Sequence, residues 1–249
     1  MDNSIAPEEN MAVNRITTGS AILDSFLEGG YESDVVTTIY GPGGSGKTNL
    51  CMLCSLAVVR NGKKVIYIDT EGNFSLARLK QLAPENYKDI LKNIFFLRPT
   101  TFQEQNNAFK KLKDLVNKSL IGLIVVDTIA MLYRLELGKS EEIYEINREL
   151  GLQLSYLTEI SCKKKIPIVL TNQVYSAFDG TNKVNMVGGD ILKYGSKCLV
   201  ELQKARANKR MAILRKHRSI PEERSVFFEI IEKGITEVKN SRSDNPIVF

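Results

Sequence analysis

Residues 41–48 read Gly41-Pro42-Gly43-Gly44-Ser45-Gly46-Lys47-Thr48, which is a complete G-x-x-x-x-G-K-T phosphate-binding loop. Its glycines allow consecutive backbone N–H groups to turn inward around a di- or triphosphate, where a Cβ atom would intrude. Lys47 is expected to reach the β- and γ-phosphates, and the Thr48 hydroxyl is expected to bind Mg²⁺. Together with Asn49, the loop forms the predicted nucleotide-binding segment.

The residues on both sides of the loop support this prediction. Residues 35–40 are β-branched or apolar and predict a strand that leads into the loop. After the loop, Leu50, Leu53 and Val58 fall on one face of a helix. A helix that begins near Lys47 would direct the positive end of its dipole at the same phosphates.

Short apolar strands alternate with helical stretches along the chain. The predicted strands are 35–40, 64–69, 94–97, 121–127 and 166–171, and the predicted helices lie near 47–60, 75–83, 101–117 and 140–164. This alternation predicts βαβ units in an α/β fold, with a mostly parallel twisted sheet and helices on both faces. Beyond Gly195, four consecutive strands at 198–203, 211–214, 225–231 and 235–238 predict an antiparallel extension at one sheet edge.

The simplest organisation is one core with two short ends. We predict the core over residues 15–240, an N-terminal tail at 1–14 and a short C-terminal tail at 241–249. The N-terminal tail is polar and is interpreted as a flexible end, with a docking arm as the alternative. It carries no apolar signal region, and no apolar run in the chain approaches the ~18 residues of a membrane helix.

Cysteine spacing raises the question of a metal or redox site. Cys51-Met52-Leu53-Cys54 has C-x-x-C spacing, but it lies in the helix after the phosphate loop, with Cys54 on the apolar face. The chain has no second C-x-x-C pair and a single histidine, His217. Ordinary helix packing is therefore favoured for these cysteines.

Three other strand ends carry polar groups. An apolar run ends in Asp127, which is predicted to hold Mg²⁺ beside the loop. Glu71 lies in Asp69-Thr70-Glu71-Gly72, where it would activate a water for attack on the γ-phosphate, although the same residues also suit a plain turn. Gln173 follows the strand at 166–171, either as a γ-phosphate sensor or as an ordinary strand-end amide.

These motifs occur in the same order in a known family. The chain resembles RecA-type recombinases in its phosphate loop, Ile68-Asp69-Thr70-Glu71-Gly72, Val125-Val126-Asp127, Thr171-Asn172-Gln173-Val174, Gly188-Gly189 and Phe227-Phe228-Glu229-Ile230. The resemblance is strongest to the archaeal RadA and eukaryotic branch and covers about residues 15–238. It implies a P-loop RecA-like ATPase core that uses ATP and Mg²⁺.

The resemblance also implies roles for single residues. Glu71 matches the carboxylate that activates the attacking water, and Gln173 matches the γ-phosphate sensor. Lys47 completes the predicted catalytic set. Arg78 matches the arginine that stacks on adenine, although the sequence alone would place it on a solvated helix face.

Two departures from the recombinase pattern are visible. The N-terminal helical DNA-binding domain of archaeal RadA has no room here, and Lys216-His217-Arg218-Ser219-Ile220-Pro221-Glu222 differs at its position. Both departures point to a short archaeal paralogue of RadA. Residues 1–14 contain no aromatic residue that would tether the next subunit of a filament. A dimer or small oligomer is therefore as reasonable an expectation as a filament.

Basic residues are concentrated in one segment. The net charge is only +5, from 34 basic and 29 acidic side chains. Residues 203–221 contain no Asp or Glu, but they hold Lys204, Arg206, Lys209, Arg210, Arg215, Lys216 and Arg218. On a β-hairpin these cations would line a groove for a DNA backbone. The alternative is a solvated hairpin, or one that meets acidic groups of a neighbouring subunit.

The segment after Gln173 is the second candidate for DNA contact. Residues 174–187 include Tyr175, Phe178 and Lys183, and an aromatic here would stack on a base or pack at the loop root. The counterpart of the first recombinase DNA loop, about residues 134–147, contains Arg134 but is otherwise acidic. Because phosphates repel carboxylates, we expect DNA binding without robust strand exchange.

The sequence thus favours an ATP- and DNA-binding RecA-like protein of recombination and repair, with weak DNA-dependent ATPase activity. It would be accessory to a RadA-type recombinase, with single-stranded or double-stranded DNA and its own copies as further partners. Such a protein is expected in the cytoplasm, at the nucleoid, with no membrane partner. Two alternatives remain: a nucleotide-gated adaptor that docks on the recombinase with incidental hydrolysis, and a RecA-like signalling ATPase without DNA.

Overall fold

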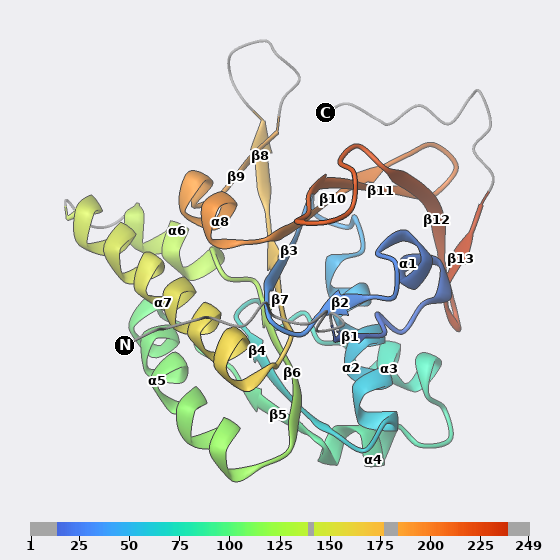
Figure 1. Cartoon of the computed structure of the whole chain (residues 1–249), viewed down its shortest axis with the longest axis horizontal. Helices are drawn as coiled ribbons and strands as arrows, with labels where there is room; N and C mark the ends of the chain where they lie inside the picture. The colour runs from blue at the N-terminus through green and yellow to red at the C-terminus, as the bar shows by residue number, and fades with distance from the viewer. Residues whose placement is uncertain (1–13, 139–141, 177–183, 239–249) are drawn as a thin grey trace, which may run out of the picture.

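The computed structural model describes residues 14–138, 142–176 and 184–238 (Figure 1). Within these residues the main sheet consists of β3 (Val36–Tyr40), β4 (Lys64–Asp69), β5 (Ile94–Leu97), β6 (Ile121–Asp127), β7 (Ile168–Asn172), β10 (Cys198–Lys204), β11 (Lys209–Lys216), β12 (Ser225–Ile231) and β13 (Gly234–Glu237). The order across the sheet is β13-β12-β11-β10-β3-β7-β6-β4-β5. Neighbours from β10 to β5 pair in parallel, and those from β10 to β13 are antiparallel.

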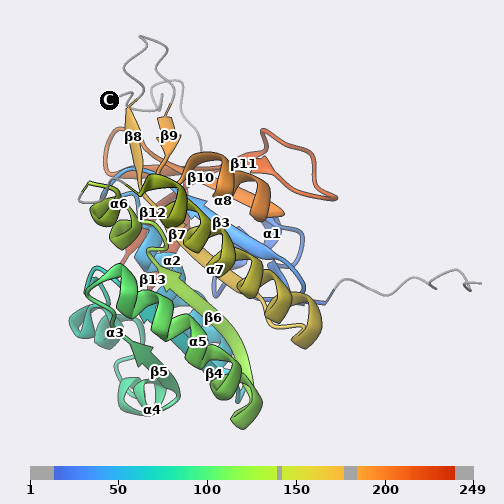
Figure 2. The same ribbon diagram turned by 90° about the vertical axis from the view of Figure 1, so that its left-hand side faces the viewer.

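Helices cover both faces of this sheet. They are α1 (Ala21–Phe26), α2 (Lys47–Arg60), α3 (Leu76–Leu82), α4 (Tyr87–Lys92), α5 (Phe102–Lys118), α6 (Met131–Leu137), α7 (Ile143–Lys164) and α8 (Gly189–Gly195). Figure 2 shows α5 and α7 in front of the sheet, on the face opposite to α2. Two antiparallel ribbons lie outside the main sheet, β1 (Arg15–Ile16) with β2 (Tyr31–Glu32) and β8 (Val174–Ser176) with β9 (Val184–Met186).

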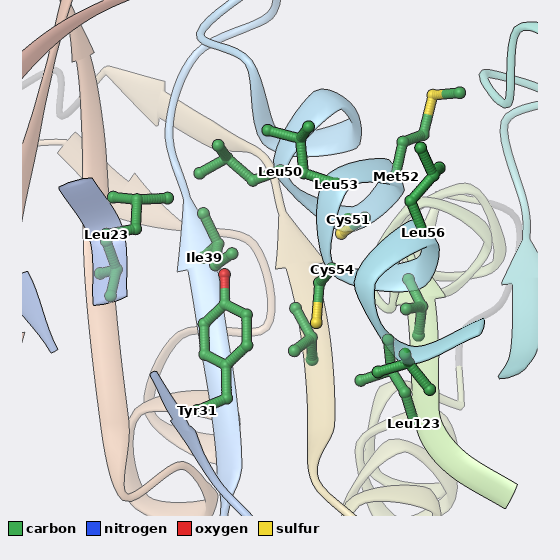
Figure 3. Packing of buried hydrophobic residues seen from close by; sticks show 14 of the residues in the cluster. Leu23, Tyr31, Ile39, Leu50, Cys51, Met52, Leu53, Cys54, Leu56 and Leu123 are labelled. Atoms are coloured by element: carbon green, nitrogen blue, oxygen red, sulfur yellow. The ribbon is translucent and has the colours of Figure 1, made fainter. Parts of the chain in front are cut away.

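The alternation of side chains along the central strands explains the two-sided core. Val125 packs in the cluster that contains α2, whereas its neighbour Val126 packs in the cluster that contains α5 and α7. Figure 3 shows α2 on the first side, with Cys51 and Cys54 buried against the sheet. Burial raises the pKa of both thiols, so they remain protonated packing groups. The packing interpretation of this C-x-x-C pair is confirmed.

The predicted α/β architecture is confirmed, with three differences. The strand at 198–204 belongs to the parallel part through β3, so the antiparallel extension begins one strand later than predicted. Residues 134–137, which the resemblance places in a DNA loop, belong to α6, and the helix predicted near 140–164 begins at Ile143. Sequence analysis also missed four helices of six or seven residues, α1, α4, α6 and α8, which are too short to show helical periodicity.

Of the two predicted tails, only Asn14 lies within the described residues, and residues 239 and 240 at the end of the predicted core lie outside them as well. Within the described part, none of the helices has both the length and the apolar character needed to span a bilayer. Thr101 caps the start of α5, because the Glu104 amide donates to Thr101 Oγ1 at 3.1 Å. The Glu104 carboxylate accepts from the Thr100 amide at 2.7 Å.

Strand register brings the polar strand ends to one edge. Tyr40 at the end of β3 pairs with Asn172 of β7, and Asp69 at the end of β4 pairs with Asp127 of β6. The residues that follow these four strand ends therefore lie along one edge of the sheet. This is the carboxyl edge, where parallel sheets bind their ligands.

Candidate nucleotide-binding site

The phosphate loop leaves β3 after Tyr40 and continues into the first turn of α2. Gly44 and Gly46 have φ angles of 72° and 106°, in the left-handed region that favours glycine. Gly41 is required by a close approach, because a Cβ atom there would lie 2.2 Å from the carbonyl oxygen of Leu202 on β10. The path of the backbone thus accounts for glycine at three positions of the motif.

The start of α2 carries donors that suit an anionic ligand. Gly46 is the N-cap residue, and no side chain caps the first turn. The first N–H groups of a helix have no partner inside the helix, and phosphate oxygens are good acceptors for them. The buried atoms Ser45 Oγ and Asn49 Nδ2 also lack a hydrogen-bond partner within the described residues. A di- or triphosphate fits this set of donors.

Lys47 lies over the loop that precedes it. Its Nζ donates to the carbonyl oxygens of Gly41 and Pro42, at 2.8 and 3.0 Å. An ammonium group has three N–H donors, so one remains for a phosphate oxygen. Burial lowers the pKa of Lys47, while the carboxylates of Asp127 and Glu71 act in the opposite direction. An added phosphate would further favour the charged form.

Asp127 is the last residue of β6 and is buried. It lines one cavity together with Lys47 and Thr48. Tyr67 OH donates to Asp127 Oδ2 at 3.0 Å, and Thr171 Oγ1 donates to Asp127 Oδ1 at 2.5 Å. Burial, together with the Asp127 charge, raises the pKa of Tyr67, which therefore stays a donor. Mg²⁺ usually takes one or two protein oxygens plus water and phosphate oxygens, and Thr48 with Asp127 fits that requirement.

Three side chains donate to the carboxylate of Glu71. Gln173 Nε2 donates to Oε1 at 2.7 Å, and Thr128 Oγ1 donates to the same oxygen at 3.3 Å. Asn73 Nδ2 donates to Oε2 at 2.6 Å. A carboxylate offers about four lone-pair sites, so one remains for a water molecule.

The backbone that carries Glu71 is tied to β6. The Thr70 amide donates to the carbonyl oxygen of Asp127 at 3.0 Å. Thr70 Oγ1 accepts from the Thr128 amide and donates to the Thr128 carbonyl oxygen, both at 2.9 Å. These bonds fix the position of Glu71 relative to Asp127 without any ligand.

Arg78 projects from α3 and is held by the turn between β12 and β13. Its guanidinium donates to the carbonyl oxygens of Ile231, Glu232 and Gly234 at 2.8, 2.9 and 3.2 Å. Its Nε donates to Asn49 Oδ1 at 2.7 Å. Burial lowers the pKa of Arg78. The flat guanidinium is therefore fixed in the wall of the cavity.

These groups line a single cavity of about 440 Å³. Ile230 of β12 adds an apolar wall to it. The predicted residues that line the cavity are Gly43, Gly44, Gly46, Lys47, Thr48, Asn49, Glu71, Arg78, Asp127 and Gln173. The combination of backbone donors, one ammonium group and a fixed carboxylate suits phosphoryl transfer to water.

The comparison with known families agrees with this geometry. A family model described as Rad51 matches residues 9–238. This chain belongs to the Rad51 family. The resemblance to RecA-type recombinases is thereby confirmed.

Individual relatives of this Rad51-family chain are similar over most of their length. The "DNA repair and recombination protein RadB" of Methanobrevibacter smithii is 43% identical over 227 residues, which cover 89% of this chain and 95% of the relative. The protein of the same name from Methanocaldococcus jannaschii is 41% identical over 215 residues, covering 86% and 98%. A solved structure described as "Crystal structure of the RadB recombinase" has a TM-score of 0.76 at 37% identity and covers 90% of this chain and 100% of that chain. The name RadB, shared by these relatives, agrees with the predicted resemblance to a short archaeal paralogue of RadA.

The structure divides the predicted basic segment of this Rad51-family chain. Arg215 pairs with Glu201 at 2.6 Å and with Glu223 at 2.5 Å. Lys216 Nζ donates to the carbonyl oxygens of Lys193 and Ser196, both at 2.8 Å. Both side chains thus bind other parts of the chain.

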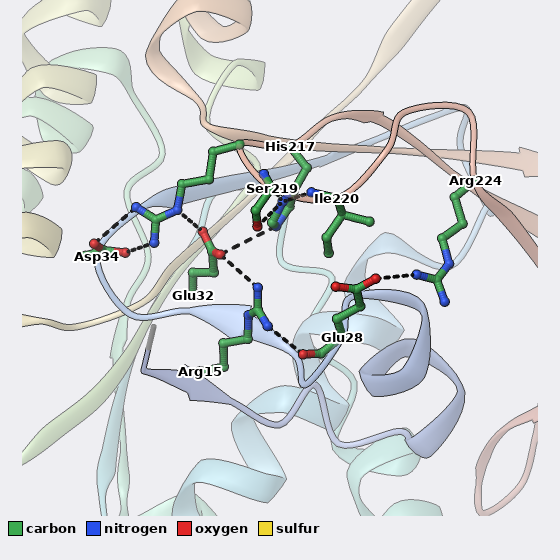
Figure 4. A network of polar contacts seen from close by, with 9 residues as sticks. Arg15, Glu28, Glu32, Asp34, His217, Ser219, Ile220 and Arg224 are labelled. Carbon is green, nitrogen blue, oxygen red and sulfur yellow. Dashed lines mark hydrogen bonds and ion pairs between the residues drawn. The ribbon is translucent and has the colours of Figure 1, made fainter. Parts of the chain in front are cut away.

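Arg218 has a similar structural role. It pairs with Glu32 at 2.7 Å and with Asp34 at 2.8 Å, in the network of Figure 4. Other segments of the chain therefore place carboxylates beside Arg215 and Arg218, and DNA binding by these two residues stays a prediction.

The other four cations lie at or near the turn between β10 and β11. Arg206 is exposed, whereas Lys204 and Lys209 are half-buried. Arg210 NH1 donates to Asn208 Oδ1 at 2.8 Å. Lys204 lies beside the phosphate loop, with Nζ 3.3 Å from the place where a Cβ atom of Gly44 would be.

A second cavity, of about 740 Å³, lies where β8 begins and β9 ends. Tyr175 and Arg134 both line it, and Tyr175 is 47% exposed, so its ring is available for stacking. The structure thus brings together the two segments expected from the resemblance. Phe178 and Lys183 lie outside the described residues.

Five residues that line the cavity were not predicted from the sequence: Met52, Asn73, Ser75, Thr128 and Ile230. Thr128 directly follows Asp127, and Asn73 directly follows the Glu71 motif, so their positions beside predicted site residues were an available signal. Ile230 had no such signal, because its place in the cavity depends on the order of strands across the sheet.

Proposed function

We propose that this chain binds ATP with Mg²⁺, hydrolyses it slowly, and acts with DNA in recombination and repair as an accessory to a RadA-type recombinase. The convergence of Lys47, Glu71, Asp127 and Gln173 around one cavity carries the proposal. The names of the relatives support the assignment to recombination and repair.

Each group in the cavity has a defined task in this proposal. The loop amides and Lys47 hold the phosphate chain, while Thr48 and Asp127 would hold Mg²⁺. Bound Mg²⁺ supplies neutralisation of the phosphate charge. Glu71 orients a water and takes its proton, using the lone-pair site that its three donors leave open. Arg78 presents its flat face to the adenine.

Slow turnover is part of the proposal. Among the described residues, the cavity is lined by the ammonium group of Lys47 and by the guanidinium of Arg78, which the β12–β13 turn holds in place. In related phosphoryl-transfer enzymes a cation supplied by a neighbouring subunit is worth roughly 10³–10⁵ in rate. A chain that has to recruit such a cation from a partner would hydrolyse ATP slowly when alone.

DNA would contact the second cavity and the β10–β11 turn. Tyr175 offers a stacking surface beside the exposed Arg134. Because Arg215 and Arg218 are paired with carboxylates, we expect the turn to neutralise fewer phosphates than its sequence predicts. If four cations contribute, the slope of log K against log salt for single-stranded DNA is about −3, rather than the roughly −4 of six phosphates.

Fluorescence anisotropy with labelled single-stranded DNA tests the proposal. Binding is measured with ATP, with ADP and without nucleotide, across a salt series. We expect the highest affinity with ATP and a clear salt slope. Lys47→Ala should abolish the effect of ATP while leaving nucleotide-free binding intact.

Two results would contradict the proposal. Absence of DNA binding at low salt in every nucleotide state would favour the signalling ATPase without DNA. Absence of ATP binding in calorimetry with Mg²⁺ would remove the nucleotide site itself.

A further inference from the structure

Lys204 occupies a position that the DNA interpretation does not explain. It ends β10, which pairs in parallel with β3, the strand that leads into the phosphate loop. Glu201 is opposite Tyr40 in this pairing. The residue after Glu201, Leu202, packs its carbonyl oxygen against Gly41. Two positions further, Lys204 therefore reaches the middle of the loop.

The contact between Lys204 and the loop is close. Nζ and Cε of Lys204 lie 3.3 and 3.4 Å from the position that a Cβ atom of Gly44 would take. Because Gly44 has no side chain, the ammonium group can lie directly against the loop backbone. Arg206, two residues later, is exposed at the turn, whereas Lys204 is half-buried. The side chain of Lys204 is thus associated with the loop as well as with the hairpin.

Charge gives a second, independent indication. Burial is the main cause that lowers the pKa of Lys47, and the nearby charge of Lys204 acts in the same direction. Two ammonium groups beside one loop repel each other. A polyanion bound in the loop would attract both of them and so offset this repulsion. The loop donors and the two cations therefore favour the same kind of ligand.

We infer that Lys204 is a second cationic residue of the nucleotide site, which acts with Lys47 on the phosphate chain of a nucleoside triphosphate. This inference rests on the proposed nucleotide binding. It moves Lys204 from the predicted DNA surface to the nucleotide site. It also makes β10 a direct link between the phosphate loop and the basic turn that follows.

The test is isothermal titration calorimetry of the full chain with ATP, ADP and AMP in the presence of Mg²⁺. The variants are Lys204→Gln, Lys204→Arg and the control Lys197→Gln. Lys197 is exposed and directly precedes the first residue of β10, so its variant makes the same charge change beside the opposite end of that strand.

Lys204→Gln should weaken ATP binding about fivefold to tenfold, with a smaller loss for ADP and almost none for AMP, because AMP lacks the phosphate chain. Lys204→Arg should restore most of the affinity, since it restores the charge. Lys197→Gln should bind ATP like the unmodified chain. Thermal unfolding of each variant checks that the fold is retained.

Three outcomes would overturn the inference. These are an unchanged ATP affinity in Lys204→Gln, an equal loss for ATP and AMP, and an equal loss in Lys197→Gln. Failure of the proposed function looks different. In that case the unmodified chain itself shows no ATP binding that depends on Lys47.

Discussion

The side-chain amide of Gln173 donates to the carboxylate of Glu71 at 2.7 Å, although the two residues lie 102 positions apart in the sequence. They come from the ends of β7 and β4, which β6 separates in the sheet. The predicted sensor and the predicted base are therefore in direct contact. A γ-phosphate that attracts the Gln173 amide would release one acceptor site on Glu71, so ligand recognition would free the carboxylate to bind a water.

Replacing Glu71 by Gln tests whether turnover matters. The variant keeps the side-chain length but cannot take a proton from water, so ATP hydrolysis should fall by roughly 10²–10⁴-fold. ATP affinity should stay within about twofold, because Glu71 contacts no loop donor. Phosphate release and calorimetry measure the two quantities. Unchanged hydrolysis would show that another group activates the water.

The same variant separates the two accessory functions. It is added to strand exchange by a RadA-type recombinase, with Lys47→Ala as the variant that loses nucleotide binding. If Glu71→Gln assists as well as the unmodified chain, the nucleotide-gated adaptor is correct and hydrolysis is incidental. Loss of assistance with ATP binding intact would show that turnover is required.

Gln173→Ala should uncouple DNA binding from the nucleotide state. Without the amide, the proposed sensor loses its hydrogen bond to Glu71 just before β8, which starts at the next residue. We expect the difference in DNA affinity between ATP and ADP to fall from about fivefold or more to about onefold. Gln103→Ala, on the exposed side of α5, is the matched control. Fluorescence anisotropy measures the DNA affinity of each variant with ATP and with ADP. If Gln173→Ala still binds DNA more tightly with ATP than with ADP, another residue is the sensor.

Arg78 is expected to bind the base through its flat face rather than through its charge. Arg78→Ala should therefore weaken ATP binding about tenfold, and Arg78→Lys should not restore it, because lysine has neither a planar face nor a fork of donors. Calorimetry with ATP compares the variants. Full recovery in Arg78→Lys would mean that charge alone is sufficient, which contradicts stacking.

The parts of the site that sequence analysis predicted depend on local spacing. The phosphate loop is specified within eight consecutive residues, and Asp127 and Glu71 each follow a recognisable strand. The surroundings of Arg78 were not predictable, because one of its acceptors, Ile231, is 153 positions away. The same holds for Arg218, which pairs with Asp34 at a separation of 184 positions. The sequence identifies the charged residues, but the order of strands in the sheet determines which of them form ion pairs.

Glu32 anchors a network of ion pairs that includes Arg218, one of the residues predicted to bind DNA. Its side chain is 1% exposed and pairs with Arg15 at 3.1 Å and Arg218 at 2.7 Å. Glu32→Gln leaves two cations without their shared carboxylate and should lower the free energy of unfolding by about 3 kcal/mol. Glu28→Gln, which breaks the exposed pair with Arg224, should cost less than about 1 kcal/mol. Urea unfolding compares the two, and equal losses would contradict the role of burial.

His217 should make stability depend on pH in the acidic range. Its Nδ1 accepts from the amides of Ser219 and Ile220, both at 3.1 Å. A proton on Nδ1 would replace this acceptor with a donor that faces two other N–H donors. The folded state therefore disfavours protonation of the ring. Burial lowers the pKa of His217 in the folded state, so the unfolded chain binds the proton more readily.

The sign of the effect follows from this depressed pKa. The contribution of His217 is fully present above about pH 6.5, the ordinary histidine value, and is lost as the pH falls below it. Glu32 opposes the shift, whereas Arg15 and Arg218 reinforce it. His217→Asn keeps a side-chain acceptor for the two amides but does not titrate. Urea unfolding at pH 7.5 and 5.5 should show a smaller loss of stability in this variant than in the unmodified chain, and an equal loss in both would assign the pH dependence to other groups.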